Sequence, residues 1–518
     1  MTAVEWFVRD LQKRGVEWVA TLCGHGLDPF DQACRKHGLR LVDVRNEQSA
    51  GYMAEAHGRL TKRPGVVAVS SAVAHANAMT GVVDAFLDGA PLLLLTGSAA
   101  LRTSGLGHFQ DIDQVALAQS ATRYARLIDR PDRTLQILDE AWRAASGVKP
   151  GPVHLTFPMD MQRTEVSERR MLPATREPAA EEAAGGQWER AVTVLGRAEQ
   201  PLIVAGSGLY YGGEAEAVCA FSREFSVPLA VSIWDRGVVD EPLEAFVGVV
   251  GAATGGPVIL PGADCILMAG AEPDYRVGYL HTGAIRDDAE VVRIDRGWRE
   301  FTEAYRKNGG KRHLGWLSEA RRRRAVYQER VKKKGEKQAG GALHALHVVK
   351  AVKKTLPDDG LLLLDGGSIG QWFHQLLPDR YPGHWLTCGR SGVVGWGLGG
   401  AMGAQATYPD RPLVLVSGDG AFTFTVAELE CAARQGLGFV AIVADDEAWG
   451  ITEQGHLQQF GEAITSKLGP IDFAGLAESL GARGLRAKSV AELEQALRDG
   501  LAHSGVTVIH ARITGGNP

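Results

Sequence analysis

The sequence lacks the features that mark disulfide-rich, zinc-binding and membrane-spanning proteins. Its six cysteines are far apart and form no CxxC pair, which excludes a zinc knuckle and a disulfide framework and predicts reduced thiols. No apolar run approaches the roughly 20 residues that a membrane helix needs, and the first residues lack the apolar core of a signal peptide. We therefore expect a cytoplasmic protein without a membrane partner.

A large excess of charge of one sign is also lacking. The formal net charge is -5 and the sequence pI is near 6.3, so no overall attraction to nucleic acid is expected. A basic run between about 305 and 340 leaves a nucleic-acid surface as an alternative. Glutamates interrupt this run and aromatic residues are sparse, which favours a solvated helix face followed by a linker. We expect no nucleic-acid partner.

The length and the pattern of apolar runs predict several α/β domains. A chain of 518 residues exceeds the size of a single core and suggests about three domains. Short apolar runs alternate with helical stretches, which is typical of parallel sheets with crossover helices. We predict three doubly wound parallel-sheet domains over residues 1–165, 186–310 and 340–518, with a linker near 165–187 and a third domain that resembles the first in pattern.

The predicted strands follow these apolar runs. They lie at 16–22, 39–44, 65–71, 91–97 and 152–158 in the first domain, at 201–208, 228–234, 265–273 and 291–295 in the second, and at 361–367, 412–420, 438–446 and 506–512 in the third.

Acidic residues follow two successive strands of the third domain. Asp419, within Ser417-Gly418-Asp419-Gly420, ends one strand, and Asp445-Asp446 end the next. Ligands gather at the carboxyl ends of parallel strands, glycines let backbone amides approach phosphate oxygens, and carboxylates bind hard cations such as Mg²⁺. The residues therefore predict a site for a metal ion and a diphosphate.

This segment resembles the thiamine-diphosphate motif, in which Gly-Asp-Gly is followed by a paired asparagine. The resemblance implies that Asp419, Asp446 and the carbonyl of Ala448 bind Mg²⁺, or Ca²⁺ or Mn²⁺ in its place. It also implies that thiamine diphosphate lies against Gly418, Gly420, Ala421 and Ile451. Asp445-Asp446 stand where asparagines are usual, which adds negative charge beside a diphosphate and puts the cofactor affinity and the preferred cation in question.

Residues 45–55 resemble the segment that carries the cofactor-activating glutamate of this superfamily. A carboxyl at the pyrimidine N1′ favours the tautomer whose N4′ can deprotonate the thiazolium C2. The resemblance assigns this role to Glu47 and a cofactor contact to Asn77, in a segment where His75 also lines such pockets. A surface glutamate would explain Glu47 alone, but not its occurrence together with the Gly-Asp-Gly motif in the expected order.

Two further segments of the third domain match the superfamily. Residues 389–397 resemble the loop that bends the cofactor, so Val394 is expected to lie between its two rings and the Gly392 carbonyl to accept a hydrogen bond from N4′. Residues 365–368 resemble the strand end that contacts the diphosphate, which assigns Gly367 and Ser368 to the cofactor site.

The substrate side is expected near His25 and Gln110. His25 lies in a glycine-flanked loop and can shuttle protons near neutral pH, although a loop hydrogen-bonding role is the alternative. Gln110 resembles a substrate-contacting glutamine of the acetohydroxyacid synthase and benzaldehyde lyase branch, to which the chain is most similar over nearly its whole length. Thr452 takes the place of an acid found in pyruvate-type decarboxylases, which favours ligation or lyase chemistry.

The resemblance implies a thiamine-diphosphate- and Mg²⁺-dependent carbon–carbon lyase or carboligase. Its expected substrates are 2-oxo acids, aldehydes or 2-hydroxy ketones, and a 2-oxo acid or 2-hydroxyacyl-CoA decarboxylase or lyase is the alternative. An inactive cofactor-binding homologue is a further alternative that the presence of Glu47 disfavours. A sugar- or nucleotide-binding protein would account for the glycines but not for the paired motifs.

The resemblance also bears on a second cofactor and on assembly. Gly206-Ser207-Gly208 and residues 274–278 faintly resemble the FAD site of acetohydroxyacid synthases, but a lone Gly-x-Gly is a weak signal, so FAD is the less favoured alternative. In this superfamily the glutamate domain of one subunit faces the diphosphate domain of another, which implies a homodimer or homotetramer.

Overall fold

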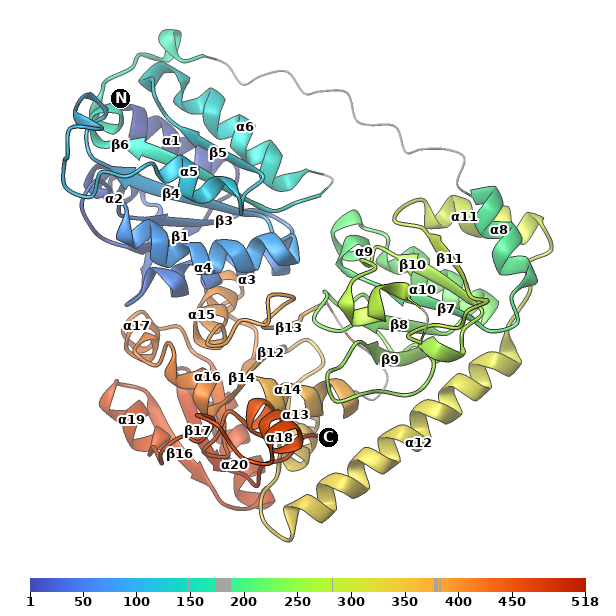
Figure 1. Cartoon of the computed structure of the whole chain (residues 1–518). Coiled ribbons are helices and arrows are strands. Elements are labelled where there is room, and N and C mark those ends of the chain that lie inside the picture. Colours follow the sequence, from blue (N-terminus) through green and yellow to red (C-terminus); the bar gives the residue numbers. More distant parts are fainter. Residues whose placement is uncertain (148, 173–187, 282, 377–380, 382) are drawn as a thin grey trace.

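The computed structural model describes residues 1–147, 149–172, 188–281, 283–376, 381 and 383–518. Three parallel sheets, each flanked by helices, form three separate units, and the long helix α12 (Leu314–Ala339) runs along the outside from the second to the third (Figure 1). This arrangement confirms the predicted α/β class with three doubly wound units. Most of the predicted linker, residues 173–187, lies outside the described residues.

The N-terminal unit has the strand order β2-β1-β3-β4-β6-β5. Strand β3 is rich in valine and buried along its whole length, as expected for a parallel strand covered on both faces. The order reverses between β1 and β3, so the loops that follow these strands meet at a switch point. The strands are β1 Trp18–Leu22, β2 Arg40–Asp43, β3 Gly65–Val69, β4 Leu92–Ser98, β5 Tyr124–Leu127 and β6 Pro152–Pro158, and the helices are α1 Ala3–Lys13, α2 Asp28–His37, α3 Glu47–Thr61, α4 Val73–Asp88, α5 Gln114–Gln119, α6 Thr134–Ser146 and α7 Met159–Arg163.

The central unit has five parallel strands in the order β11-β10-β7-β8-β9. The basic run lies on α12, where Glu319 pairs with both Arg322 and Arg323. This run is therefore helical, with part of its charge balanced within the helix. The strands are β7 Pro201–Ala205, β8 Leu229–Ser232, β9 Phe246–Val250, β10 Cys265–Ala269 and β11 Glu290–Arg293, and the helices are α8 Trp188–Arg197, α9 Ser207–Gly212, α10 Ala215–Phe225 and α11 Trp298–Lys307.

The C-terminal unit has the order β13-β12-β14-β15-β17-β16, which is the order of the N-terminal sheet shifted along the chain. The two units that resemble each other in sequence pattern thus share one topology. The strands are β12 Leu361–Asp365, β13 Trp385–Thr387, β14 Leu413–Gly418, β15 Val440–Asp445, β16 Arg483–Ala487 and β17 Thr507–Arg512, and the helices are α13 Ala345–Thr355, α14 Gly367–Leu376, α15 Gly397–Thr407, α16 Asp419–Thr423, α17 Glu428–Arg434, α18 Gly450–Phe460, α19 Phe473–Ser479 and α20 Val490–Leu501.

Four observed strands were not predicted from the sequence, and each lies at the edge of its sheet. These strands are β5, β9, β13 and β16. An edge strand has a partner on one side only and is partly exposed, so its apolar signal is weak. In β9 the apolar run is also interrupted by Gly248, whose φ of 104° accompanies a shift in register.

Helices α3 and α15 pack the N-terminal unit against the C-terminal unit. A Cβ at Gly403 would lie 2.4 Å from the carbonyl oxygen of Met53, so this close approach depends on glycine. The interface also buries Arg59 between Glu55 and Asp88 at 3.2 and 3.3 Å. One hydrophobic core therefore continues from one unit into the other.

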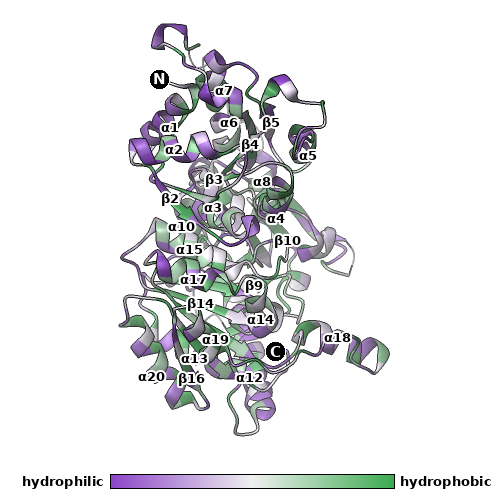
Figure 2. Ribbon diagram, turned by 90° about the vertical axis from the view of Figure 1, so that its left-hand side faces the viewer, coloured by the Kyte–Doolittle hydropathy of each residue, from purple (hydrophilic) through white to green (hydrophobic). Residues whose placement is uncertain are grey.

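Apolar residues are concentrated in the inner strands and polar residues in the outer helices. Strands β4 and β14 colour toward the hydrophobic end, whereas the outer helices carry polar stretches, and α18 extends away from the rest of the chain (Figure 2). Within the described residues, no helix combines the length and apolar character that crossing a bilayer requires.

Candidate active site

A cavity of about 310 Å³ lies at the carboxyl ends of the adjacent strands β12, β14 and β15. The strand order reverses at β12 and β14, which is where ligands bind in open α/β sheets. Every residue of the C-terminal unit that the sequence assigned to cofactor or metal lines this cavity: Gly367, Ser368, Gly392, Val394, Gly418, Asp419, Gly420, Ala421, Asp446, Ala448 and Ile451.

Two carboxylates, those of Asp419 and Asp446, line the cavity. Burial, and then repulsion by Asp446, raise the pKa of Asp419 to about 7, and burial followed by the charge of Asp445 raises that of Asp446 to about 6. A divalent cation would relieve this repulsion and favour both ionised forms. Among the described residues no group of three His, Cys, Asp or Glu side chains is placed to hold a metal, so the two aspartates need carbonyl, phosphate or water oxygens to complete a Mg²⁺ shell.

Asp445, the first residue of the unusual aspartate pair, is engaged by the protein itself. Its carboxylate interacts with His510 Nε2 at 2.8 Å and accepts the Glu447 amide at 3.1 Å. Burial opposes its ionisation, but these two bonds and the charge of Arg512 outweigh burial and lower the pKa of Asp445. Of the two aspartates that stand where asparagines are usual, only Asp446 is among the described residues that line the cavity.

Glycine stands at the cavity positions for two different structural reasons. A Cβ at Gly418 or Gly392 would meet no atom within 4 Å, so these positions leave open space that a ligand can approach. A Cβ at Gly420 would lie 2.7 Å from the Trp449 ring, and one at Gly367 would lie 3.1 Å from Ile451 Cγ2. The first pair provides room for a cofactor, and the second pair is required by packing of the chain.

Glu47 is the first residue of α3, and hydrogen bonds fix both its side chain and the turn before it. Asn46 caps the helix by accepting the Gln48 amide at 2.9 Å, and Asn77 Nδ2 donates to the Glu47 carboxylate at 3.0 Å. The buried Glu428 of α17 accepts the backbone amides of Arg45 and Asn46 at 3.0 and 3.1 Å. The C-terminal unit thus fixes the turn that presents Glu47.

His25 and Gln110 lie together at the switch point of the N-terminal sheet. The His25 ring stacks on His108 at 5.7 Å, and Ser71 Oγ donates to Gln110 Oε1 at 2.7 Å. Gln110 has a φ of 57° and lines a second cavity of about 440 Å³. His75 lines neither cavity: it is fully buried against His154 at 4.5 Å, and burial lowers its pKa to about 4. We correct the expectation that His75 faces a pocket, because its helix turns the ring into the core.

Three family models match the chain in sequence order. The N-terminal TPP binding domain of thiamine pyrophosphate enzymes matches residues 1–117, their central domain matches 188–309, and their C-terminal TPP binding domain matches 365–511. Thiamine pyrophosphate is another name for thiamine diphosphate. The chain belongs to the thiamine pyrophosphate enzyme family.

Several curated relatives extend over nearly the whole chain. A probable acetolactate synthase of Mycobacterium bovis is 28% identical over 530 residues, covering 98% of this chain and 95% of the relative. The 2-hydroxyacyl-CoA lyase 2 of Homo sapiens is 27% identical over 533 residues, covering 92% and 83%, respectively. The large subunit of acetolactate synthase isozyme 1 of Escherichia coli is 26% identical over 532 residues, covering 99% and 94%.

The cavity of this thiamine pyrophosphate enzyme also includes residues that the sequence did not point to. Trp234 and Ala253 come from the central unit, and Gln371, His374 and Cys388 come from the C-terminal unit. Trp234 has a φ of 68°, an unusual conformation for a large residue. Its sequence neighbours carry no motif, so only the packing of the central unit against the third reveals it.

The N-terminal site residues are not brought to this cavity within one chain. Glu47, His25, Asn77 and Gln110 are absent from its lining among the described residues. The C-terminal half of the predicted site is therefore assembled by the chain, and the N-terminal half faces elsewhere.

The segments that resemble a flavin site do not fit a nucleotide phosphate. The start of α9, where a phosphate would lie, already holds the Asp235 carboxylate, which accepts the Ser207 amide at 3.2 Å. A Cβ at Gly206 would lie 2.6 Å from the same carboxylate. Asp235 is in turn bound by the buried Arg276 at 2.8 Å. A phosphate would have to displace this ion pair.

Proposed function

We propose that this enzyme makes or cleaves a carbon–carbon bond next to a carbonyl, with 2-oxo acids, aldehydes or 2-hydroxy ketones as substrates. The observation that carries the proposal is that one cavity at the strand ends gathers the carboxylates of Asp419 and Asp446, open glycines and an apolar loop. Thiamine diphosphate, when bound, supplies a thiazolium carbon that adds to a carbonyl carbon.

The residues of the C-terminal unit take the binding roles. Asp419, Asp446 and the Ala448 carbonyl would hold Mg²⁺, whose positive charge would offset the negative charge of a bound diphosphate. Gly418 would leave room for the phosphate oxygens, and the Val394 side chain would lie between the two cofactor rings. The proposal includes no FAD in the central unit, because the Asp235 carboxylate accepts the Ser207 amide that a phosphate at the start of α9 would need. The proposal also includes the domain boundaries and a cytoplasmic location. The domains span residues 1–165, 186–310 and 340–518.

The residues of the N-terminal unit take the proton-transfer roles. Glu47 holds a proton at the pyrimidine N1′ and is oriented by Asn77. His25 moves a proton to or from the substrate oxygen, and Gln110 binds the substrate through its amide.

A second copy of the chain completes each site in this proposal. Both α4 and α18 expose apolar side chains. On one face of α4, Val73, Val83 and Leu87 are 64%, 41% and 40% exposed. On α18, Leu457 and Phe460 are 48% and 55% exposed. Such apolar surfaces beside a half-assembled site fit a homodimer or homotetramer. An equimolar mixture of Glu47→Gln and Asp419→Asn subunits tests this assembly. About half of the dimers that form by random pairing are mixed, and each of these has one of its two sites intact, so the mixture regains about a quarter of the wild-type activity. Sites confined to one chain would regain none.

A 2-hydroxyacyl-CoA lyase is the second candidate, because relatives of that name match 92% of the chain. Incubation with pyruvate, glyoxylate, benzaldehyde, benzoin and a 2-hydroxyacyl-CoA, with the products identified by NMR, separates the two candidates. Titration of the protein with thiamine diphosphate and Mg²⁺ while its melting temperature is followed tests both. Absence of any thermal response would refute the proposal.

A further inference from the structure

The loop that carries Gly392 and Val394 is attached to both neighbouring units. On one side, the Arg390 amide donates to Asp88 Oδ1 at 2.7 Å and Ser391 Oγ donates to Asp84 Oδ1 at 2.5 Å. Both aspartates belong to α4 of the N-terminal unit. This loop contains glycines with positive φ at 389, 392 and 395, so it has few conformational restraints of its own. Its position depends on these attachments.

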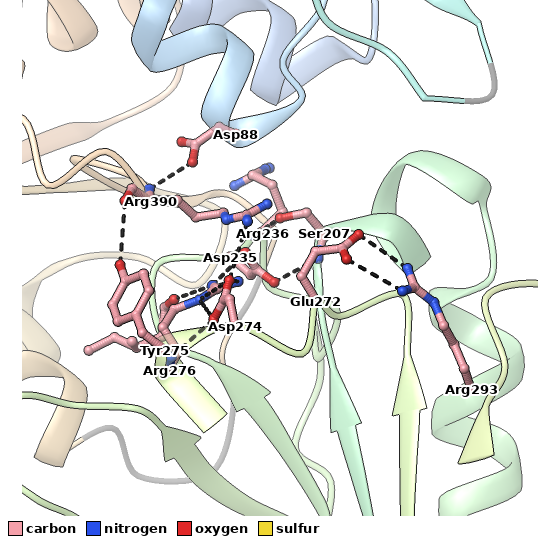
Figure 3. A network of polar contacts seen from close by, with 11 residues as sticks. Asp88, Ser207, Asp235, Arg236, Glu272, Asp274, Tyr275, Arg276, Arg293 and Arg390 are labelled. Carbon is pink, nitrogen blue, oxygen red and sulfur yellow. Dashed lines mark hydrogen bonds and ion pairs between the residues drawn. The ribbon is translucent and has the colours of Figure 1, made fainter. Parts of the chain in front are cut away.

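The central unit holds the other side of the loop through Arg390. The Arg390 guanidinium lies 3.2 Å from Asp274 Oδ2, and the two side chains are 26% and 20% exposed. The Tyr275 hydroxyl lies 3.5 Å from the Arg390 carbonyl oxygen. Figure 3 shows Arg390 between Asp88 on one side and Asp274 on the other.

A buried ion-pair chain fixes Asp274 in turn. Arg276 binds Asp274 at 3.0 Å and Asp235 at 2.8 Å, and the side chains of Arg276 and Asp235 are 0% and 3% exposed. Asp235 caps the start of α9 through the Ser207 amide. This series of ion pairs runs from the strand ends of the central unit to Arg390. The polar groups of the central unit are therefore directed at the loop (Figure 3).

We propose that Asp274 is a positioning residue. Through its ion pair with Arg390, Asp274 holds the loop of Gly392 and Val394 in the conformation that binds the cofactor. The central unit thus uses the polar groups at its strand ends to order the cofactor loop of the third unit. This inference rests on the proposed binding of thiamine diphosphate in the adjoining cavity.

Asp274→Asn and Arg390→Gln, with their double variant, test the proposal. Glu272→Gln is the matched control, because Glu272 lies two residues away and pairs with Arg293 at the surface instead. The dissociation constant for thiamine diphosphate with saturating Mg²⁺ is measured by calorimetry. Amide hydrogen exchange of residues 388–396 is measured in the cofactor-free protein, which gives a readout independent of activity.

Each single variant is expected to weaken cofactor binding by about threefold to tenfold, as for one partly buried charge-assisted hydrogen bond, and to speed exchange of the loop. The double variant is expected to bind no more weakly than Arg390→Gln, because the two residues act as a pair. Arg390→Lys is expected to recover part of the loss, and Glu272→Gln to behave as wild type.

Wild-type affinity and exchange in Arg390→Gln would overturn the inference. This variant leaves Arg276 with both of its partners, so a general loss of folding in the central unit does not obscure its result. Failure of the wild-type protein itself to bind thiamine diphosphate would instead refute the proposed function.

Discussion

Replacing either of the two adjacent aspartates at the end of β15 by asparagine is predicted to change the stability of the metal-free protein, but in opposite directions. The pKa of Asp446 is raised to about 6, first by burial and then by the charge of Asp445. The pKa of Asp445 is lowered by its bonds to His510 and to the Glu447 amide, in spite of burial. Asp446→Asn therefore removes an unfavourable charge from the metal-free protein, whereas Asp445→Asn removes a compensated one.

The size of the Asp446 effect follows from its pKa. A rise from 3.8 to about 6 corresponds to at most about 3 kcal/mol of lost stability at high pH. Because the folded pKa exceeds that of the unfolded chain, this loss is absent below about pH 4 and complete above about pH 7. Asparagine does not titrate, so the metal-free variant is expected to gain about 1–3 kcal/mol at pH 8 and little at pH 4.5.

Thermal unfolding of the metal-free protein in a chelator, at pH 4.5 and pH 8, measures this difference. For a folding unit of about 180 residues, 1 kcal/mol shifts the melting temperature by about 2–4 °C. Asp445→Asn is the matched control and is expected to lower the melting temperature at pH 8 by a few degrees, because His510 and the Glu447 amide lose a charged acceptor. An unchanged or lowered melting temperature of Asp446→Asn at pH 8 would refute the electrostatic account of the site.

Three further predictions concern cofactor and metal. Glu47→Gln is expected to reduce turnover by about 10²–10⁴-fold, because it cannot hold the N1′ proton as a carboxylic acid does, with the rate measured by NMR product assay. Gly418→Ala is expected to leave the melting temperature of the cofactor-free protein unchanged and to weaken the binding of thiamine diphosphate by about tenfold. Gly420→Ala is expected to lower the melting temperature, because its methyl group would lie 2.7 Å from the Trp449 ring. Mg²⁺ affinity, measured by calorimetric titration, is expected to fall by about tenfold per bound proton and pH unit between pH 7 and 5, because protons compete for Asp419 and Asp446.

Each of these predictions has a contradicting result. Near-wild-type turnover of Glu47→Gln would refute its role as cofactor activator. Equal thermal destabilisation by the two glycine substitutions would contradict the distinction between open and packed positions. A Mg²⁺ affinity independent of pH would show that the two carboxylates do not bind the ion.

The predicted strands differ from the observed ones mainly at the sheet edges. Central strands such as β3, β12 and β14 are buried on both faces, so they read as continuous apolar runs that the sequence reveals. Strand β16, with sequence RGLRA, exposes both of its arginines, and no local pattern distinguishes it from a loop. Its existence depends on pairing with β17, a property of the assembled sheet.

The C-terminal half of the site follows from the order of the strands in the sequence. Residues that directly follow parallel strands converge at one edge of the sheet, so strand position alone brought Gly367, Asp419 and Asp446 to one cavity. Only the tertiary structure separated Asp445 from Asp446, because the compensating His510 comes from another strand and its effect depends on a distance of 2.8 Å. Tertiary packing likewise decided that Trp234 joins the cavity, that Glu47 does not reach it within one chain, and that Asp274 holds Arg390. These contacts join residues that are far apart in the sequence, and no local sequence pattern specifies how the units that carry them meet.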